Sequence, residues 1–140
     1  KNPEFYATVQ RMARILVAED DESVRQFVAR ALTHGGHEVT VSENGLLALD
    51  RLAAESYDLL LTDILMPGMD GIALALKTAK ENPDMPILLM TGYAAEKQRA
   101  HNLNVLIHRV ISKPFTLKEI CDAVDNALAG KGGRNPGNVD

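Results

Sequence analysis

The chain has 140 residues, of which 46% are hydrophobic and 24% are charged, the balance of an ordinary soluble globular domain. Its formal net charge of −4 gives no reason to expect nucleic acid or an anionic membrane surface as a partner, and no apolar run approaches the roughly 20 residues that span a bilayer. The single cysteine, Cys121, excludes an internal disulfide and suits a reducing compartment, so we expect a cytoplasmic protein with one folded domain.

The two ends of the chain differ in composition from the middle. Residues 1–11 show no clear periodicity, and Met12 stands just before the first β-rich run. We interpret this segment as a flexible extension or as residues added during cloning. Residues 130–140 are dense in Gly, Asn and Pro and nearly lack apolar side chains, which predicts a disordered tail. The folded domain is therefore expected over residues 12–129.

Short apolar runs alternate with longer helical patterns along this domain. Strands are predicted at 15–18, 37–42, 59–62, 87–90 and 105–111, and helices at 22–33, 44–55, 71–80, 94–101 and 116–128. The last helix begins with Thr116 and Glu119 at the spacing of a capping box, whereas helix 94–101 is polar and weakly patterned. The alternation predicts an α/β fold, (βα)₅, with helices on both faces of a parallel sheet, because right-handed crossovers place them there.

Polar side chains stand where the predicted strands end. Glu19 and Asp20 follow the first strand, Asp63 the third, Thr91 the fourth and Lys113 the fifth. Because the carboxyl ends of parallel strands meet at one edge of the sheet, we expect these groups to converge there. Three carboxylates at close range repel one another unless cations neutralise them. Mg²⁺, which prefers oxygen ligands, and the Lys113 ammonium suit that purpose.

This set of residues indicates phosphoryl chemistry. Asp63 is a carboxylate nucleophile able to form an acyl phosphate, and Mg²⁺ and Lys113 would offset charge on the transferring oxygens. Thr91 could donate a hydrogen bond to the new phosphate. Two plainer interpretations stay open: Glu19 and Asp20 could simply cap the following helix, and Lys113 with Pro114 could form an ordinary turn.

Four fragments, in this order, resemble the CheY-like receiver domain of two-component response regulators. They are ILVAEDDESVR at 15–25, LLLTDILMPGMDG at 59–71, LLMTG at 88–92 and SKPF at 112–115. The resemblance implies a doubly wound, flavodoxin-like fold with five parallel strands in the order 2-1-3-4-5. It also implies a phosphorylation-dependent signalling switch, not an enzyme, whose phosphodonor is a histidine kinase or a histidine phosphotransferase.

The resemblance assigns a role to each residue of the site. Asp63 matches the phosphoacceptor, Asp20 the direct Mg²⁺ ligand and Glu19 the acid that acts on the metal through water. The backbone carbonyl of Leu65 matches the third protein ligand of the metal. Thr91 matches the switch hydroxyl and Lys113 the lysine that contacts the phosphate, with a cis peptide bond expected at Lys113–Pro114.

The chain departs from the family pattern at two positions. Glu19 replaces an acid that is often Asp, which should shift the metal geometry without abolishing the site. Val110 stands three residues before Lys113, where the family often has an aromatic switch residue. Tyr93 and His108 are the two candidates for that switch role, and the sequence does not choose between them.

The sequence also bears on output. Eleven residues follow the folded domain expected over 12–129, so a complete chain would act as a single-domain regulator through protein binding. As a whole it is similar to CpdR-type regulators, which implies an adaptor for an AAA+ protease of the ClpXP kind in regulated proteolysis. The alternatives are an excised receiver domain of a larger DNA-binding regulator or hybrid histidine kinase, and a flavin binder of the same topology. The acids after the first strand argue against a flavin phosphate.

Two further expectations concern the surface. Arg99, His101, Arg109 and Lys118 are candidate partner contacts on the side formed by the fourth helix, fifth strand and fifth helix. Leu65 stands two residues after Asp63, and Tyr93 two residues after Thr91. Neither side chain carries an acid or amide group that would orient water, so we expect slow autodephosphorylation.

Overall fold

The computed structural model describes residues 12–102 and 109–130. Its sheet has five parallel strands in the order β2-β1-β3-β4-β5, so the predicted fold class and strand order are confirmed. The strands are β1 (Arg14–Ala18), β2 (Glu38–Ser42), β3 (Leu59–Asp63), β4 (Ile87–Thr91) and β5 (Arg109–Ser112). The helices are α2 (Glu22–His34), α3 (Gly45–Ala54), α4 (Gly71–Glu81), α5 (Ala94–His101) and α6 (Leu117–Ala129).

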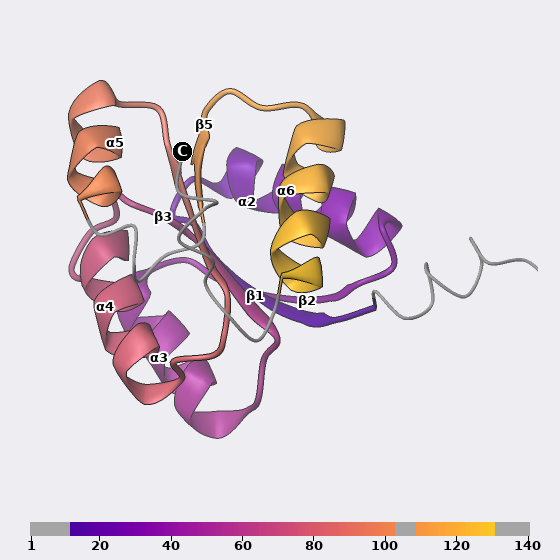
Figure 1. Cartoon of the computed structure of the whole chain (residues 1–140), viewed down its shortest axis with the longest axis horizontal. Coiled ribbons are helices and arrows are strands. Elements are labelled where there is room, and N and C mark those ends of the chain that lie inside the picture. The colour runs from indigo at the N-terminus through magenta and orange to yellow at the C-terminus, as the bar shows by residue number, and fades with distance from the viewer. Residues whose placement is uncertain (1–11, 103–108, 131–140) are drawn as a thin grey trace, which may run out of the picture.

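Helices cover both faces of the sheet (Figure 1): α2 and α6 pack on one face, and α3, α4 and α5 on the other. Because successive side chains of a strand point to opposite faces, each central strand contributes to two separate cores. β3 and β4 are buried along their whole length, which explains their continuous apolar runs. The first core includes Ile15, Val17, Leu61, Leu88 and Met90, and the second includes Leu16, Ala18, Leu60, Leu89 and Ile87.

Most predicted boundaries fall within one or two residues of the observed ones. The predicted strand 105–111 corresponds to β5 at Arg109–Ser112, and its first part lies outside the described residues. The predicted extension at 1–11 and nearly all of the predicted tail at 130–140 lie outside them too. No helix in the described parts of the chain is long and apolar enough to cross a membrane.

Side chains fix the first turns of most helices. The caps are Asp21 for α2, Asn44 for α3, Asp70 for α4 and Thr116 for α6. Thr116 and Glu119 form the predicted capping box. α5 differs, because Tyr93 at its N-cap makes no side-chain hydrogen bond and Ala100 is its buried residue. The helix that follows Thr91 is therefore held to the sheet by little apolar contact.

Gly71 begins α4 at a point where no side chain fits. Its N–H donates to the Ile64 carbonyl at 2.7 Å and closes the loop that follows Asp63. A Cβ atom at position 71 would collide with the backbone carbonyl oxygen of Asp63. The loop that positions the candidate phosphoacceptor therefore depends on the glycine.

We expect Gly71→Ala to lower the free energy of unfolding by about 3 kcal/mol, since the backbone must shift to accept the methyl group. Urea denaturation measures this change. Gly92→Ala is the matched control, because a Cβ there would lie 3.7 Å from the Lys113 Cβ, an ordinary contact. Equal stabilities of the two variants would contradict the steric argument.

Candidate functional site

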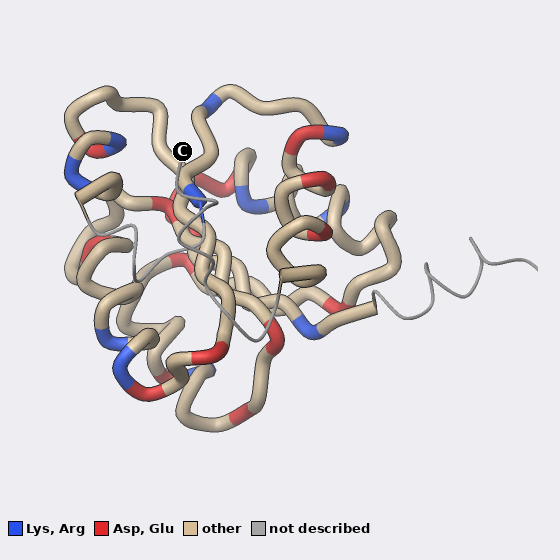
Figure 2. The backbone as a smooth tube through the Cα atoms, viewed as in Figure 1, with Lys and Arg blue, Asp and Glu red and all other residues tan. Residues whose placement is uncertain are grey.

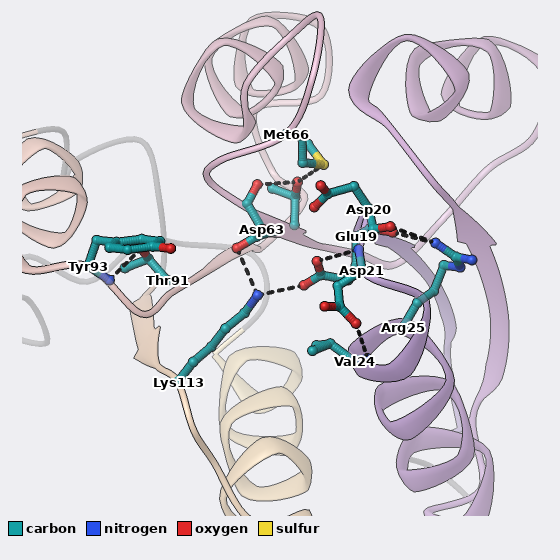
Figure 3. Close-up of polar contacts among 11 residues, drawn as sticks. Glu19, Asp20, Asp21, Val24, Arg25, Asp63, Met66, Thr91, Tyr93 and Lys113 are labelled. Atoms are coloured by element: carbon teal, nitrogen blue, oxygen red, sulfur yellow. Dashed lines mark hydrogen bonds and ion pairs between the residues drawn. The ribbon is translucent and has the colours of Figure 1, made fainter.

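The polar residues predicted from the strand ends come together at one edge of the sheet. Asp63 ends β3, with the acids that follow β1 on one side and Thr91 of β4 on the other (Figure 3). Glu19, Asp20 and Asp63 each offer a carboxylate oxygen, and these oxygens lie within 4.8 Å of one another. Glu19 and Asp63 are buried and Asp20 is exposed. Acidic and basic segments meet at this edge in Figure 2.

Lys113 links the two buried carboxylates. Its Nζ donates to Glu19 Oε1 at 2.8 Å and lies 3.2 Å from Asp63 Oδ1. Burial alone would lower the pKa of Lys113, but Glu19 and Asp63 raise it above its ordinary value. The ammonium therefore stays charged and neutralises part of the negative charge at this edge of the sheet.

The neutralisation is incomplete. Burial raises the pKa of Glu19, and the charge of Asp63 adds to the effect, although the hydrogen bonds from Lys113 and from the Asp21 N–H oppose it. Burial likewise raises the pKa of Asp63, with Asp20 adding and Lys113 opposing. The site thus still favours additional positive charge.

Backbone and side-chain contacts hold the acidic loop after β1 in place. Arg25 Nη1 donates to the Glu19 carbonyl at 2.9 Å, and the Glu19 N–H donates to the Ser42 carbonyl at 3.0 Å. Asp21 caps α2 by accepting from the Val24 N–H at 3.1 Å. Sequence reasoning missed the role of Arg25. The position of Arg25, one turn after Asp21 and in the first turn of the helix, could have indicated a contact with the acidic loop.

These residues fit a Mg²⁺ ion. Asp20 is exposed beside two buried acids, which suits a direct ligand. Both oxygens of Glu19 already accept hydrogen bonds, Oε1 from Lys113 and Oε2 from the Asp21 N–H, which suits a role through water. The Leu65 carbonyl as a third ligand stays a prediction. Asp63 would belong both to the metal site and to the reaction.

Thr91, at the end of β4, forms a hydrogen bond with the loop that follows it. The buried Thr91 Oγ1 accepts from the Tyr93 N–H at 3.1 Å, while the Tyr93 side chain is exposed. Val110 is half-buried against the second core. His108 lies outside the described residues, so the choice of switch residue stays a prediction.

The loop after Asp63 is tied to α5 by an ion pair that sequence reasoning missed. Asp70, the cap of α4, accepts from Arg99 Nη2 at 2.8 Å, and Arg99 also pairs with Glu96. Burial opposes the effect, but the Ala73 N–H and Arg99 hold the pKa of Asp70 below its ordinary value. Arg99 thus already has partners on its own chain, as Lys118 has in Asp122. Being exposed, such pairs are weak enough for a partner to displace them.

A pocket of about 460 Å³ opens beside Lys113. Phe27 of α2 and Phe115, whose ring centroids are 6.2 Å apart, contribute much of its apolar wall. The neighbouring Lys113–Pro114 peptide bond is cis, as expected. The residues that line the pocket are Ser23, Val24, Phe27, Lys113, Pro114 and Phe115.

Comparisons with known proteins agree with this geometry. The family model of the response regulator receiver domain matches residues 15–125. The response regulator receiver protein CpdR of Brucella abortus is 42% identical over 117 residues, which cover 84% of this chain and 98% of that protein. The response regulator MprA of Mycobacterium avium is 34% identical over 76% of this chain, which spans 47% of MprA.

Solved structures share the fold. TrrA of Thermotoga maritima, in complex with Mg²⁺ and BeF, superposes with a TM-score of 0.76 at 30% identity, covering 83% of this chain and 99% of that one. A receiver domain protein from Clostridium thermocellum gives a TM-score of 0.78 at 24% identity, covering 85% and 96%. The likeness to both structures extends over nearly the whole of each.

The buried carboxylates predict how stability depends on pH. The folded-state pKa values of Glu19 and Asp63 lie above the ordinary 4.5 and 3.8, so the native chain binds protons more tightly than the unfolded chain above those values. The free energy of unfolding of the metal-free chain should therefore fall as pH rises through the raised pKa values. Asp63→Asn removes one of these carboxylates, so its stability relative to wild type should increase with pH.

Urea denaturation in EDTA, from about pH 4 to neutrality, measures this difference. Glu55→Gln is the control of opposite sign, because the Tyr57 hydrogen bond lowers the pKa of Glu55 and its contribution is lost as pH falls. A difference between Asp63→Asn and wild type that does not vary with pH would contradict the electrostatic interpretation.

Proposed function

The chain belongs to the response-regulator receiver family, and on that premise we propose that it is a phosphorylation-dependent switch that accepts a phosphoryl group on Asp63 with Mg²⁺. The observation that carries this proposal is the position of Asp63, buried between the acidic pair and Lys113. An Asp63 oxygen attacks the phosphorus of the donor and forms a P–O bond. The bond from phosphorus to the donor's leaving group breaks, and the leaving group keeps the electron pair.

Other residues of the site would bind the phosphoryl group and offset its charge. Lys113, 3.2 Å from an Asp63 oxygen, is within reach of a phosphoryl group attached there and offsets its charge. Bound Mg²⁺ would supply further neutralisation of the phosphoryl oxygens. The Thr91 hydroxyl, now bonded to the Tyr93 N–H, can reorient to donate to the phosphate. That change would alter the loop leading into α5.

We also propose that the phosphodonor is a histidine kinase or histidine phosphotransferase that docks at the Phe27–Phe115 pocket. The pocket is apolar, open to solvent, and lined on one side by Lys113. A partner seated there would lie directly beside the site. An apolar docking patch next to a reactive carboxylate suits transfer from a protein more than from a small molecule.

For output we propose binding to another protein, as a cytoplasmic adaptor for regulated proteolysis by an AAA+ protease of the ClpXP kind. The support is the 42% identity to CpdR over 98% of that protein's length. The second candidate is the receiver part of a larger regulator, favoured by the match to MprA, of which the chain spans about half.

Phosphorylation provides the direct test. Acetyl phosphate with Mg²⁺ should add one phosphoryl group to the wild type, seen by intact mass spectrometry as a hydroxylamine-labile adduct. Asp63→Asn should show none, because an amide is not a nucleophile at this pH, and EDTA should abolish the reaction of the wild type. Asp50→Asn, an exposed acid on α3, is the matched control and should react normally. Labelling of Asp63→Asn at wild-type extent would refute the assignment.

The lifetime of the phosphorylated form is a separate prediction. Leu65 and Tyr93 are exposed at the rim of the site, and neither can act as a base or hold water as an amide does. We expect the wild type to release phosphate slowly. In a Leu65→Asn, Tyr93→Glu variant the rate of release should rise about 10²-fold, since a side chain that positions a water molecule accelerates the reaction by that order. Phosphate release measures the rate.

Leu117→Asn, an exposed leucine on α6, is the control and should not change the rate. If the double variant releases phosphate no faster than wild type, these two side chains do not set the lifetime.

A further inference from the structure

Exposed leucines gather on one face beside the site. Leu46 and Leu47, in the first turn of α3, are 57% and 43% exposed, and Leu65, in the loop after β3, is 42% exposed. Pro67 lies exposed in the same loop. We call these four residues the leucine face.

The two segments that carry the leucine face are in contact. A Cβ added at Gly68 would lie 3.9 Å from Leu46 Cδ1, and one added at Gly45 would press on the Met69 carbonyl. The first turn of α3 therefore packs against the β3–α4 loop, which brings Leu46 next to the Pro67–Gly68 segment. Leu46 and Pro67 thus lie side by side, and Leu47 and Leu65 stand within two residues of them in the sequence.

The core does not need these leucines. α3 already buries Gly45 and Ala48 and packs Leu49 and Leu52 against the second core. Leu46 and Leu47 lie outside this contact. Single exposed leucines are common, but several together beside a functional loop mark an interaction surface.

Carboxylates border the leucine face. Glu43 lies just before α3, and Asp50 lies one turn after Leu46 on the same helix. Both are exposed.

We propose that the leucine face binds a segment of a partner protein that presents aliphatic side chains flanked by Lys or Arg. Apolar side chains would cover the leucines, and the basic groups would face Glu43 and Asp50. The inference rests on the proposed output through protein binding and states where that partner sits. The site lies on the α3 side of Asp63, away from the Phe27–Phe115 pocket on the α2 side, and it includes the loop that follows Asp63.

The test is a titration of the ¹⁵N-labelled full chain, with and without beryllofluoride and Mg²⁺, followed by NMR. Three synthetic peptides of equal length serve as probes: one of Leu and Lys, one of Leu and Glu, and one of Ser and Lys. The Leu/Lys peptide should give saturable shifts of the amide signals of residues 45–47, 65, 66 and 68, and the other two should not. Leu46→Ser with Leu47→Ser should weaken its binding at least about tenfold.

Matched variants separate the surface from general hydrophobicity. Leu76→Ser and Leu117→Ser remove leucines of similar exposure on α4 and α6, and they should bind as the wild type does. Glu43→Lys with Asp50→Lys should shift the preference toward the Leu/Glu peptide. That second pair also tests the proposal should the leucine variant fold poorly.

Three results would overturn the inference: shifts centred on Phe27 and Phe115, unchanged binding by both variant pairs, or self-association that the leucine variant abolishes, which would make a second copy the occupant. Phosphorylation of Asp63 is measured on the same samples. Normal phosphorylation without peptide binding rejects the inference alone. Absent phosphorylation in the wild type rejects the proposed function and leaves the peptide result standing.

Discussion

The ion pairs of Lys113 make the rest of the site possible. The fold brings two carboxylates, Glu19 and Asp63, out of water at one edge of the sheet, where burial and mutual repulsion both disfavour their charge. The ammonium contacts both, at 2.8 and 3.2 Å. It does not cancel them, since both acids keep a raised pKa. A divalent cation would therefore enter a site that still carries excess negative charge. A phosphoryl group on Asp63 would have the Lys113 ammonium beside it.

The parallel sheet is what brings these groups together. Lys113 follows β5, Glu19 follows β1 and Asp63 ends β3, three strands far apart in the sequence that end at the same edge. Local chemistry then positions the loops: Asp21 caps α2, and Asp70 and Gly71 start α4. α5 is different, with little buried surface and two polar anchors, Lys97 to Ser112 and Arg99 to Asp70. A helix held in this way can move at smaller cost than one packed by leucines.

Much of this could be predicted from the sequence because it depends on local patterns. Buried parallel strands appear as apolar runs, and the residue after each run stands at the edge of the sheet, which was enough to find Asp63, Glu19, Asp20, Thr91 and Lys113. The strand order came from the family resemblance, since periodicity does not specify which strands are neighbours.

The features that escaped prediction depend on distances across the fold. Arg99 meets Asp70 across 29 positions of the sequence. No spacing rule on one helix or strand reports such pairs. Phe27 occupies an apolar position of α2, yet it is 40% exposed at a pocket, because its neighbour Phe115 comes from a loop near the other end of the chain. Hydrophobic patterns identify which face of a helix is apolar and leave open how much of it the rest of the fold covers.

The placement of the two apolar surfaces has a consequence for signalling. The Phe27–Phe115 pocket and the leucine face flank the same carboxylate, one on the α2 side of the sheet and the other on the α3 side. A phosphodonor at the first and an output partner at the second would not compete for the same side chains. The first would lie beside Lys113, which contacts Asp63, and the second would contact the loop that follows Asp63. On the proposed function, charge added to Asp63 would act on both surfaces through the site itself, by attracting Lys113 beside the pocket and by altering the loop that carries Leu65. On this arrangement input and output need no long-range path through the core, because each surface lies within one loop of the phosphoacceptor.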